Sequence, residues 1–345
     1  MFQQKLVGRA LQAAAFRKPD LLPVYGSSEL DQGEWTHPRQ LFGQYPTGFA
    51  IFPVGVGGTT TINFLENLAA VGDAVRGRKV VIVLSPQFYF NNLHGNPRGY
   101  ARTFSRLQAY ELALSAPLSF GLRQAAARRL LAFPDTLTND PVLKQILDSL
   151  ADGRPRAQAV YYTVLPVAWL NLLALRLQDH WHTLAVIWDH AEWRKRAVHK
   201  PAELDWSALL ERATQEDAAG GGPRGGAGKY VENAAEFLTI VRDADEWTDL
   251  DLLLRVLREL GARPLIFSMP LNAEFFDKRG ITRTVRTVLY EKMEAAIAPY
   301  GVPFFGFFDH DGDRYFLKDN GGHPSRRGWI HYSEVMDRFY RDQLR

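Results

Sequence analysis

Short apolar runs alternate along this chain with longer segments in which apolar residues recur every three or four positions. The short runs are rich in β-branched and aromatic residues, and turn-forming residues follow them. They cover 21–25, 49–54, 79–84, 264–267 and 302–308. Helical periodicity covers 60–71, 247–260, 283–298 and 325–340. The alternation predicts an α/β domain, in which crossover helices join the five strands of a parallel sheet.

One connection in this pattern is far too long for a simple crossover. The third predicted strand ends at 84 and the helix before the fourth begins at 247, whereas an ordinary crossover needs roughly a dozen residues or somewhat more. Few strand signals lie between, so we expect an inserted, mostly helical subdomain at 93–232, with 1–92 and 233–345 forming the core. The glycine-rich stretch at 218–228 predicts a mobile loop or hinge, because glycine leaves the backbone free to move. It lacks the strand and the Ser or Thr of a phosphate-binding loop.

The most apolar part of the insertion is 157–177. Its length raises the possibility of a membrane-spanning helix. Pro166, Asn171 and Arg176 interrupt it, and hydrophilic flanks follow closely. Because charge and proline are costly within a span, the sequence favours a buried or groove-lining helix.

Composition narrows the class of protein. The 41 basic and 38 acidic residues leave a net charge of +3, so no strong overall field would hold nucleic acid or an anionic bilayer, and any binding patch must be local. The absence of cysteine excludes thiolate catalysis, thiolate metal sites and disulfides. The first twenty residues contain no export signal or spanning segment, and we expect that a native upstream anchor is missing from this chain.

The first predicted strand runs directly into Gly26, Ser27, Ser28 and Glu29. Ligands of open α/β sheets bind at the carboxyl edge of the strands, where a serine would have backbone amides close by. Ser28 is therefore a candidate nucleophile, with Ser27 as the alternate. Taken alone, the turn favours a serine that merely caps the next helix, with Glu29 in its first turn.

A histidine near the other end of the chain could serve such a nucleophile. His323 follows Asp319, Asn320 and two glycines, just before the last predicted helix. A carboxylate a few residues before a histidine can accept the Nδ1 proton and leave Nε2 as the base. The loops after the first and last strands can meet at one edge of the sheet, although a solvated surface histidine is an equal interpretation of this loop alone.

Two further loops could supply hydrogen-bond donors to the same edge. After the second strand, the glycine-rich segment 55–60 can aim backbone amides at a developing negative charge, although simple turn chemistry also explains its glycines. After the third strand, the side-chain amide of Gln87 is a possible further donor.

Together these pieces resemble the SGNH (GDSL-like) hydrolase superfamily, and in detail its DltD family, whose members act in D-alanylation of cell-envelope polymers such as teichoic acid. The matching segments are LPVYGSSEL at 22–30, GVGG at 55–58, VLSPQFYF at 83–90, FSMPLNAEFFD at 267–277 and YFLKDNGGHPSRRGW at 315–329. The resemblance implies a three-layer α/β core with the catalytic serine at Ser28 and the general base at His323.

The resemblance also implies roles for the surrounding residues. Gly58 and the Ser28 amide would form the oxyanion hole, with Gln87 as a further donor. The superfamily has aspartate three residues before the histidine, where this chain has Asn320, and Asp319 lies one residue further back. Either residue could orient His323, and we favour Asp319 because a carboxylate also stabilises the imidazolium.

The implied function is an extracytoplasmic serine acyltransferase that needs no cofactor or metal. By resemblance, its partners are a D-alanyl carrier system and a membrane-bound O-acyltransferase, its acceptor is an envelope polymer, and nucleic acid is not expected. Acidic groups such as Glu29, Asp309 and Asp311 would suit the positively charged donor amine. Two alternatives stay open: an esterase that removes acyl groups at the same site, and a catalytically silent SGNH-like module that binds a carrier, glycan or membrane partner.

Other patterns are weaker. Asp309, Asp311 and Asp313 alternate as in calcium loops, but Gly312 and Asn320 occupy the wrong positions for one, so a polar turn is favoured. Three histidines, His180, His182 and His190, lie near one another without a metal-binding motif and favour packed or surface roles. The basic pairs and runs at 194–196 and 326–327 favour solvated charge over a phosphate or lipid site.

Overall fold

The computed structural model describes residues 8–31, 33–91, 94, 96–189, 203–220, 231–320 and 322–344, with only the backbone for 185–189. Five parallel strands form one sheet in the order β2-β1-β3-β4-β5. They are β1 (Leu21–Tyr25), β2 (Ala50–Val54), β3 (Lys79–Val83), β4 (Arg263–Phe267) and β5 (Phe304–Phe305). The predicted α/β class with a five-stranded parallel sheet is confirmed.

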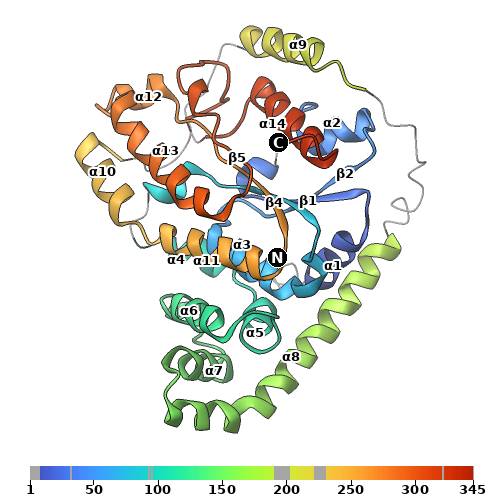
Figure 1. Ribbon diagram of the computed structural model, residues 1–345, viewed down its shortest axis with the longest axis vertical. Coiled ribbons are helices and arrows are strands. Elements are labelled where there is room, and N and C mark those ends of the chain that lie inside the picture. The colour runs from blue at the N-terminus through green and yellow to red at the C-terminus, as the bar shows by residue number, and fades with distance from the viewer. Residues whose placement is uncertain are drawn as a thin grey trace.

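Helices cover both faces of the sheet (Figure 1). On one face lie α1 (Arg9–Arg17), α3 (Thr61–Val71), α11 (Glu246–Glu259) and α13 (Arg283–Ile297), and on the other lie α2 (Pro38–Gln44) and α14 (Arg326–Tyr340). Alternate strand residues supply the two cores: Val80 and Ile82 face the first group, and Val81 and Val83 face the second. The result is the three-layer arrangement expected for parallel strands that are buried on both sides.

The inserted segment is mostly helical in the residues that the structure describes. Its helices are α4 (Pro97–Thr103), α5 (Arg106–Leu114), α6 (Phe120–Leu131), α7 (Pro141–Asp152), α8 (Pro155–Asp189) and α9 (Trp206–Ala219), followed by α10 (Ala234–Asp243). Helices α5 to α8 share an apolar core below the sheet in Figure 1. A bidentate ion pair from Arg129 to Asp249, at 2.7 and 3.0 Å, joins α6 to α11. Helix α9 packs instead on α14, so the insertion contacts the core at two separate places. The limits 93–232 stay a prediction.

One prediction about the bounds of an element is wrong. The fifth strand is not 302–308 but only two residues long, because Phe307 adopts a left-handed conformation (φ 52°) and a short 3-10 turn, Phe308–His310, follows. The aromatic residues after this strand pack against other rings and do not pair with a neighbouring strand. Phe307 contacts Tyr332 at 4.6 Å between ring centroids, and Phe308 stacks on Tyr290 at 4.0 Å.

The apolar segment at 157–177, predicted as a buried or groove-lining helix, lines two surface pockets and is not fully buried. It lies within α8, and only 17% of its most apolar window is buried. A stripe formed by Ala168, Leu172 and Leu175 packs on the neighbouring helices, whereas the opposite side is exposed. The helix is therefore not buried, although its length and composition alone would allow it to cross a membrane. Periodicity did not show this, because apolar residues lie on both sides of the helix.

Candidate active site

Three residues from the two ends of the chain meet at the carboxyl edge of the sheet. Ser28 Oγ lies 2.8 Å from His323 Nε2, and His323 Nδ1 lies 2.7 Å from Asp319 Oδ2. The His323 and Asp319 side chains are about one-fifth exposed. Ser28 follows β1, which lies between β2 and β3, so the chain leaves β1 at the point where the strand order reverses. Such switch points are where open α/β sheets bind ligands.

The turn after β1 is fixed by the turn after β2. The amide of Gly26 donates to the Val54 carbonyl at 3.0 Å, which extends the strand pairing by one residue. Gly55 has φ of +145°, and a Cβ there would lie 1.8 Å from the Gly26 carbonyl oxygen. Only glycine allows this close approach of the two backbones. The next glycine, Gly57, lies directly beside Ser28, since a Cβ there would be 3.5 Å from the Ser28 Cβ.

Ser27 and Glu29 are structural supports for the turn. The Ser27 amide donates to Glu29 Oε1 at 2.5 Å, and the Ser27 hydroxyl accepts from the Gly58 amide at 3.1 Å. Glu29 is buried, and burial raises the pKa of its carboxyl group. The serine of this pair that contacts His323 is therefore Ser28, while Ser27 bridges the first two loops.

The histidine loop is closed by backbone hydrogen bonds. The Lys318 amide donates to the His323 carbonyl at 3.0 Å, and Leu317 and Pro324 form an antiparallel bridge. Ser325 then caps α14 by accepting from the Gly328 amide at 3.1 Å. Helix α14 buries Trp329 completely, which fixes the loop on the core. The shape of this loop, with four residues between the paired ends, brings Asp319 to the histidine ring.

Asn320 contacts a different part of the molecule. Its side-chain oxygen accepts from Asn272 Nδ2 at 3.1 Å, and Asn272 in turn caps α12 (Ala273–Asp277). The structure thus places Asp319, and not Asn320, against His323 Nδ1. The extra residue relative to the superfamily spacing is accommodated within the loop.

Both predicted oxyanion donors lie near the site. The Gly58 amide donates to Ser27 Oγ, as described above, and is held one residue from Gly57 beside Ser28. The side-chain nitrogen of Gln87 would lie 3.9 Å from a Cβ on Gly322, next to His323. Gln87 therefore approaches the histidine loop from the end of β3.

Arg102 is a residue that the sequence did not single out. It lies on α4 in the insertion, and its guanidinium donates to the Gly57 carbonyl. The Gly57 carbonyl and the Gly58 amide belong to one peptide group, which is thus held between Arg102 and Ser27. A cation on the carbonyl polarises the peptide toward a stronger N–H donor. No motif marks Arg102, so only its position in the fold identifies it.

A cleft adjoins the far side of Asp319. Its volume is about 480 Å³, and it lies between α9 and the loop before α14. Glu34, Glu216, Asp217, Tyr315, Asp319 and Arg326 are among its lining residues. Arg326 pairs with Glu216 and Asp217 at 3.2 Å each, so the basic residues at 326–327 hold α9 in place.

Other residues flagged from the sequence have different roles. Asp311 is buried and pairs with the guanidinium groups of Arg283, at 2.7 Å, and Arg286, at 3.0 Å. Asp309 is exposed. Among the described residues, no cluster of His, Asp and Glu forms a metal site. His180 and His182 lie on α8, whereas His190, the basic run at 194–196 and most of the glycine-rich stretch lie outside the described residues.

The parallel sheet, a serine after its first strand and a histidine before its last helix define an SGNH-like α/β protein. A family model described as DltD protein matches residues 1–222 and 228–341, and the chain belongs to this family. Proteins named Protein DltD are similar over most of their length: that of Bacillus subtilis is 26% identical, covering 99% of this chain and 86% of the relative, and that of Staphylococcus aureus is 25% identical, covering 96% and 84%. That of Lacticaseibacillus rhamnosus is 23% identical over 92% and 77%. Family membership supports a role in D-alanylation of a cell-envelope polymer.

Proposed function

We propose that this chain is a serine acyltransferase that carries D-alanine on Ser28 during modification of the polymer. The observation that supports the proposal most strongly is the continuous hydrogen-bonded line from Ser28 Oγ through His323 to Asp319. A serine that served only as a helix cap would not need its hydroxyl on an imidazole. This geometry favours the enzyme over the silent binding module.

In the first step, Ser28 Oγ attacks the carbonyl carbon of a D-alanyl thioester or ester, and its proton passes to His323 Nε2. The tetrahedral oxyanion is stabilised by the Ser28 and Gly58 amides, with Gln87 as a further donor. For this the Gly58 amide exchanges its acceptor, Ser27 Oγ, for the oxyanion. The carbon–sulfur or carbon–oxygen bond to the donor then breaks, and the leaving group takes the proton from His323.

In the second step, an acceptor hydroxyl attacks the Ser28 ester and gives its proton to His323. The bond to Ser28 Oγ breaks, and the proton returns to the serine. Water in place of the hydroxyl would give the esterase reaction at the same site, so exclusion of water decides between the two. We place the reaction outside the cytoplasm, with a D-alanyl carrier system and a membrane-bound O-acyltransferase as partners, on the basis of family membership.

Labelling with a fluorophosphonate tests the nucleophile. We expect the wild-type chain to be labelled covalently and Ser28→Ala to lose the label entirely, because the reagent needs an activated hydroxyl. Ser207→Ala, which changes an exposed serine on α9, is the matched control and should label normally. Undiminished labelling of Ser28→Ala would contradict the assignment, and loss of the label from Ser27→Ala with peptide mapping to Ser27 would identify the alternate nucleophile.

A further inference from the structure

The exposed side of α8 is unusually apolar for a surface helix. The outer face of α8 consists of Tyr162, Val167, Trp169, Leu170, Leu173, Leu177, Trp181 and Leu184, which are all exposed by more than a third. Tyr162, Trp169, Leu173, Leu177, Trp181 and Leu184 are three, four or seven residues apart, so they lie along one side of the helix. This face spans about 33 Å at the rise of an α-helix. None of the exposed residues between 162 and 184 is Asp, Glu, Lys or Arg.

The inner face of α8 is fixed to the protein and cannot turn away from it. Asp179 is buried and accepts from the Gly8 and Ala10 amides at 2.7 Å each, which caps the start of α1. Arg176 donates to both oxygens of the buried Glu111 at 2.6 Å. Two polar anchors beside an apolar stripe therefore hold α8 along the side of the molecule.

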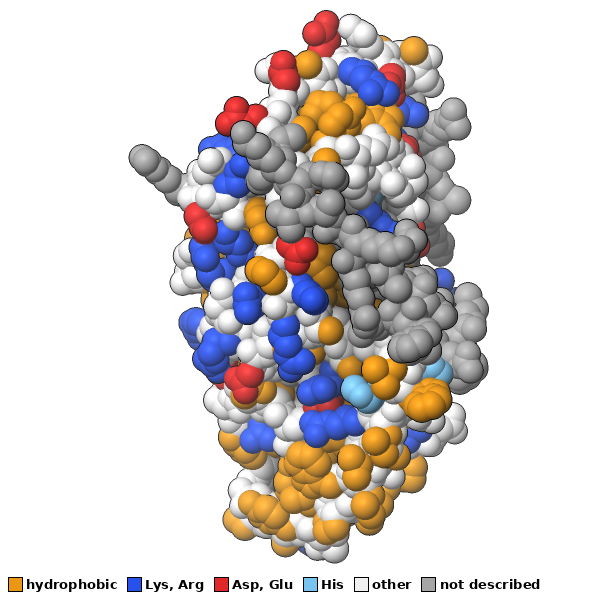
Figure 2. All heavy atoms as spheres, turned by 90° about the vertical axis from the view of Figure 1, so that its right-hand side faces the viewer, with side chains coloured by type: hydrophobic (Ala, Val, Ile, Leu, Met, Phe, Trp, Pro, Cys, Tyr) orange, Lys and Arg blue, Asp and Glu red, His pale blue; other side chains and the backbone are white. Residues whose placement is uncertain are grey.

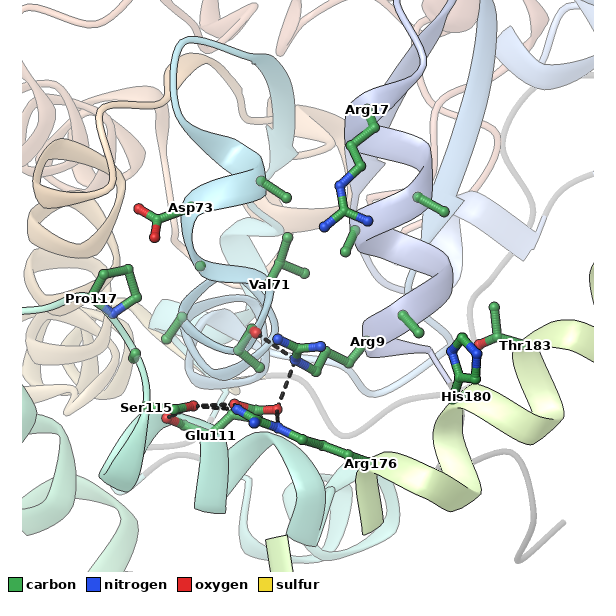
Figure 3. A pocket seen from close by; sticks show the side chains of 18 of the residues that line it. Arg9, Arg17, Val71, Asp73, Glu111, Ser115, Pro117, Arg176, His180 and Thr183 are labelled. Atoms are coloured by element: carbon green, nitrogen blue, oxygen red, sulfur yellow. Dashed lines mark hydrogen bonds and ion pairs between the residues drawn. The ribbon is translucent and has the colours of Figure 1, made fainter. Parts of the chain in front are cut away.

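A basic pocket lies next to the carboxyl-terminal half of this face. Figure 3 shows Arg9 and Arg17 from α1 and Arg176 and His180 from α8 around it. Its volume is about 450 Å³. Glu111 neutralises part of the charge, since it pairs with both Arg9, at 2.8 Å, and Arg176. Within the described part of the chain, Arg17 makes no ion pair, and its guanidinium points toward the pocket.

The basic residues continue from this pocket along the same side of the molecule. A second pocket at the carboxyl end of α1 is lined by Lys18, Arg78, Lys79 and Arg263, of which Lys79 and Arg263 pair with Asp342. In Figure 2, hydrophobic side chains gather over the lower part of the molecule, and Lys and Arg side chains lie directly above them. An apolar face bordered by cations matches the cross-section of a bilayer surface, with acyl chains on one side and phosphate groups on the other.

We propose that the outer face of α8 lies in the surface of an anionic phospholipid bilayer, with a lipid phosphate in the pocket formed by Arg9, Arg17 and Arg176. Leucines and valine on the outer face enter the acyl region. Trp169, Trp181 and Tyr162 have rings suited to the boundary between acyl chains and headgroups. Arginine suits the phosphate because its guanidinium donates two parallel hydrogen bonds. This contact is independent of the chemistry proposed at Ser28.

Vesicle flotation tests the proposal on the full chain. We expect the wild-type chain to float with vesicles of equal parts phosphatidylcholine and phosphatidylglycerol. Leu170→Asp combined with Leu173→Asp should reduce the bound fraction at least tenfold, because two charges enter the outer face. Arg17→Gln should reduce binding to these vesicles severalfold while leaving the weaker binding to pure phosphatidylcholine unchanged. An excess of soluble glycerol phosphate should not release the protein, since it lacks the acyl chains.

The matched control is Leu238→Asp combined with Val288→Asp, which places two charges on exposed apolar positions of α10 and α13. This variant should float like the wild type. Circular dichroism and fluorophosphonate labelling should be unchanged in all variants, which separates this proposal from the one at Ser28. Failure of the wild type to bind protein-free vesicles would overturn the proposal and indicate a protein surface as the occupant, and equal losses in the control would overturn it as well.

Discussion

Asp319→Asn is expected to slow acylation of Ser28 by roughly ten-thousandfold, the effect seen when the carboxylate of a serine triad is neutralised. Asp319 Oδ2 accepts the Nδ1 proton of His323 at 2.7 Å, and this contact fixes the tautomer that leaves Nε2 free for Ser28. An asparagine that presents its amide NH₂ to Nδ1 would favour the opposite tautomer. The rate of fluorophosphonate labelling under pseudo-first-order conditions measures the effect directly.

Asn320→Ala is the matched comparison at the neighbouring position. Because Asn320 contacts Asn272 and not the histidine ring, its loss should slow labelling by less than about tenfold. Both variants should retain the wild-type thermal unfolding midpoint within a few degrees. If Asn320→Ala were the slower variant, Asn320 and not Asp319 would orient the His323 ring.

Glu66→Gln is expected to change how the stability of the protein depends on pH. Glu66 lies on α3, is fully buried near Tyr100 and Asp249, and burial raises the pKa of its carboxyl group from 4.5 to about 8. In the folded protein this carboxyl group therefore binds a proton at pH values where the unfolded chain has released it. Its contribution to stability is fully present below pH 4.5 and is lost as the pH rises through 8.

Glutamine stays neutral, so the variant lacks this loss. Between pH 5 and 8, the free energy of unfolding of the wild type should fall relative to that of Glu66→Gln by about 1.4 kcal/mol per pH unit, a few kcal/mol in all. Denaturant titrations at several pH values measure the difference. Glu294→Gln, at an exposed position on α13, should give no such divergence. Parallel pH profiles for the wild type and Glu66→Gln would show that Glu66 is ionised in the folded protein.

Most of the core could be predicted from the sequence because its elements obey local rules. The first strand has the bounds that its apolar run predicts, and α3, α11, α13 and α14 begin and end within one residue of the predicted helices. The fifth strand was overestimated because aromatic residues that pack around Tyr290 and Tyr332 resemble a strand in sequence. Pattern alone does not distinguish pairing from packing in a run of phenylalanines.

The sequence and the resemblance predicted that Ser28, His323 and Asp319 approach one another, but not the contacts that support them. Ser28, His323 and Asp319 stand out because they lie in turns beside predicted strands and helices, and the resemblance then orders them. The structure adds the bridge from Ser27 to Gly58 and the contact of Arg102 with Gly57. The first contact joins two loops of the core, and the second depends on packing of the insertion on the core, for which the sequence contains no periodic signal. Catalytic roles for these residues stay a prediction.

For the long apolar helix α8, the sequence predicted the element but not its environment. Sequence indicated that α8 is a helix with polar interruptions, but not which side faces solvent. Asn171 and Arg176, which appeared to interrupt a span, are the residues that attach the helix to Tyr110 and Glu111. The exposure of its outer face follows from that attachment, and it can be seen only in three dimensions.

The most direct test of the proposed chemistry is to trap D-alanine on the enzyme. A D-alanyl thioester is mixed with the full chain, the reaction is quenched in acid within seconds, and peptides are mapped by mass spectrometry. We predict that the peptide containing Ser28 gains the mass of one alanyl group, and that the adduct is absent from Ser28→Ala and disappears when an acceptor hydroxyl is supplied. An alanyl group found on another residue would contradict the account. So would consumption of the thioester at saturating donor while Ser28 stays unmodified in both the wild type and Asp319→Asn.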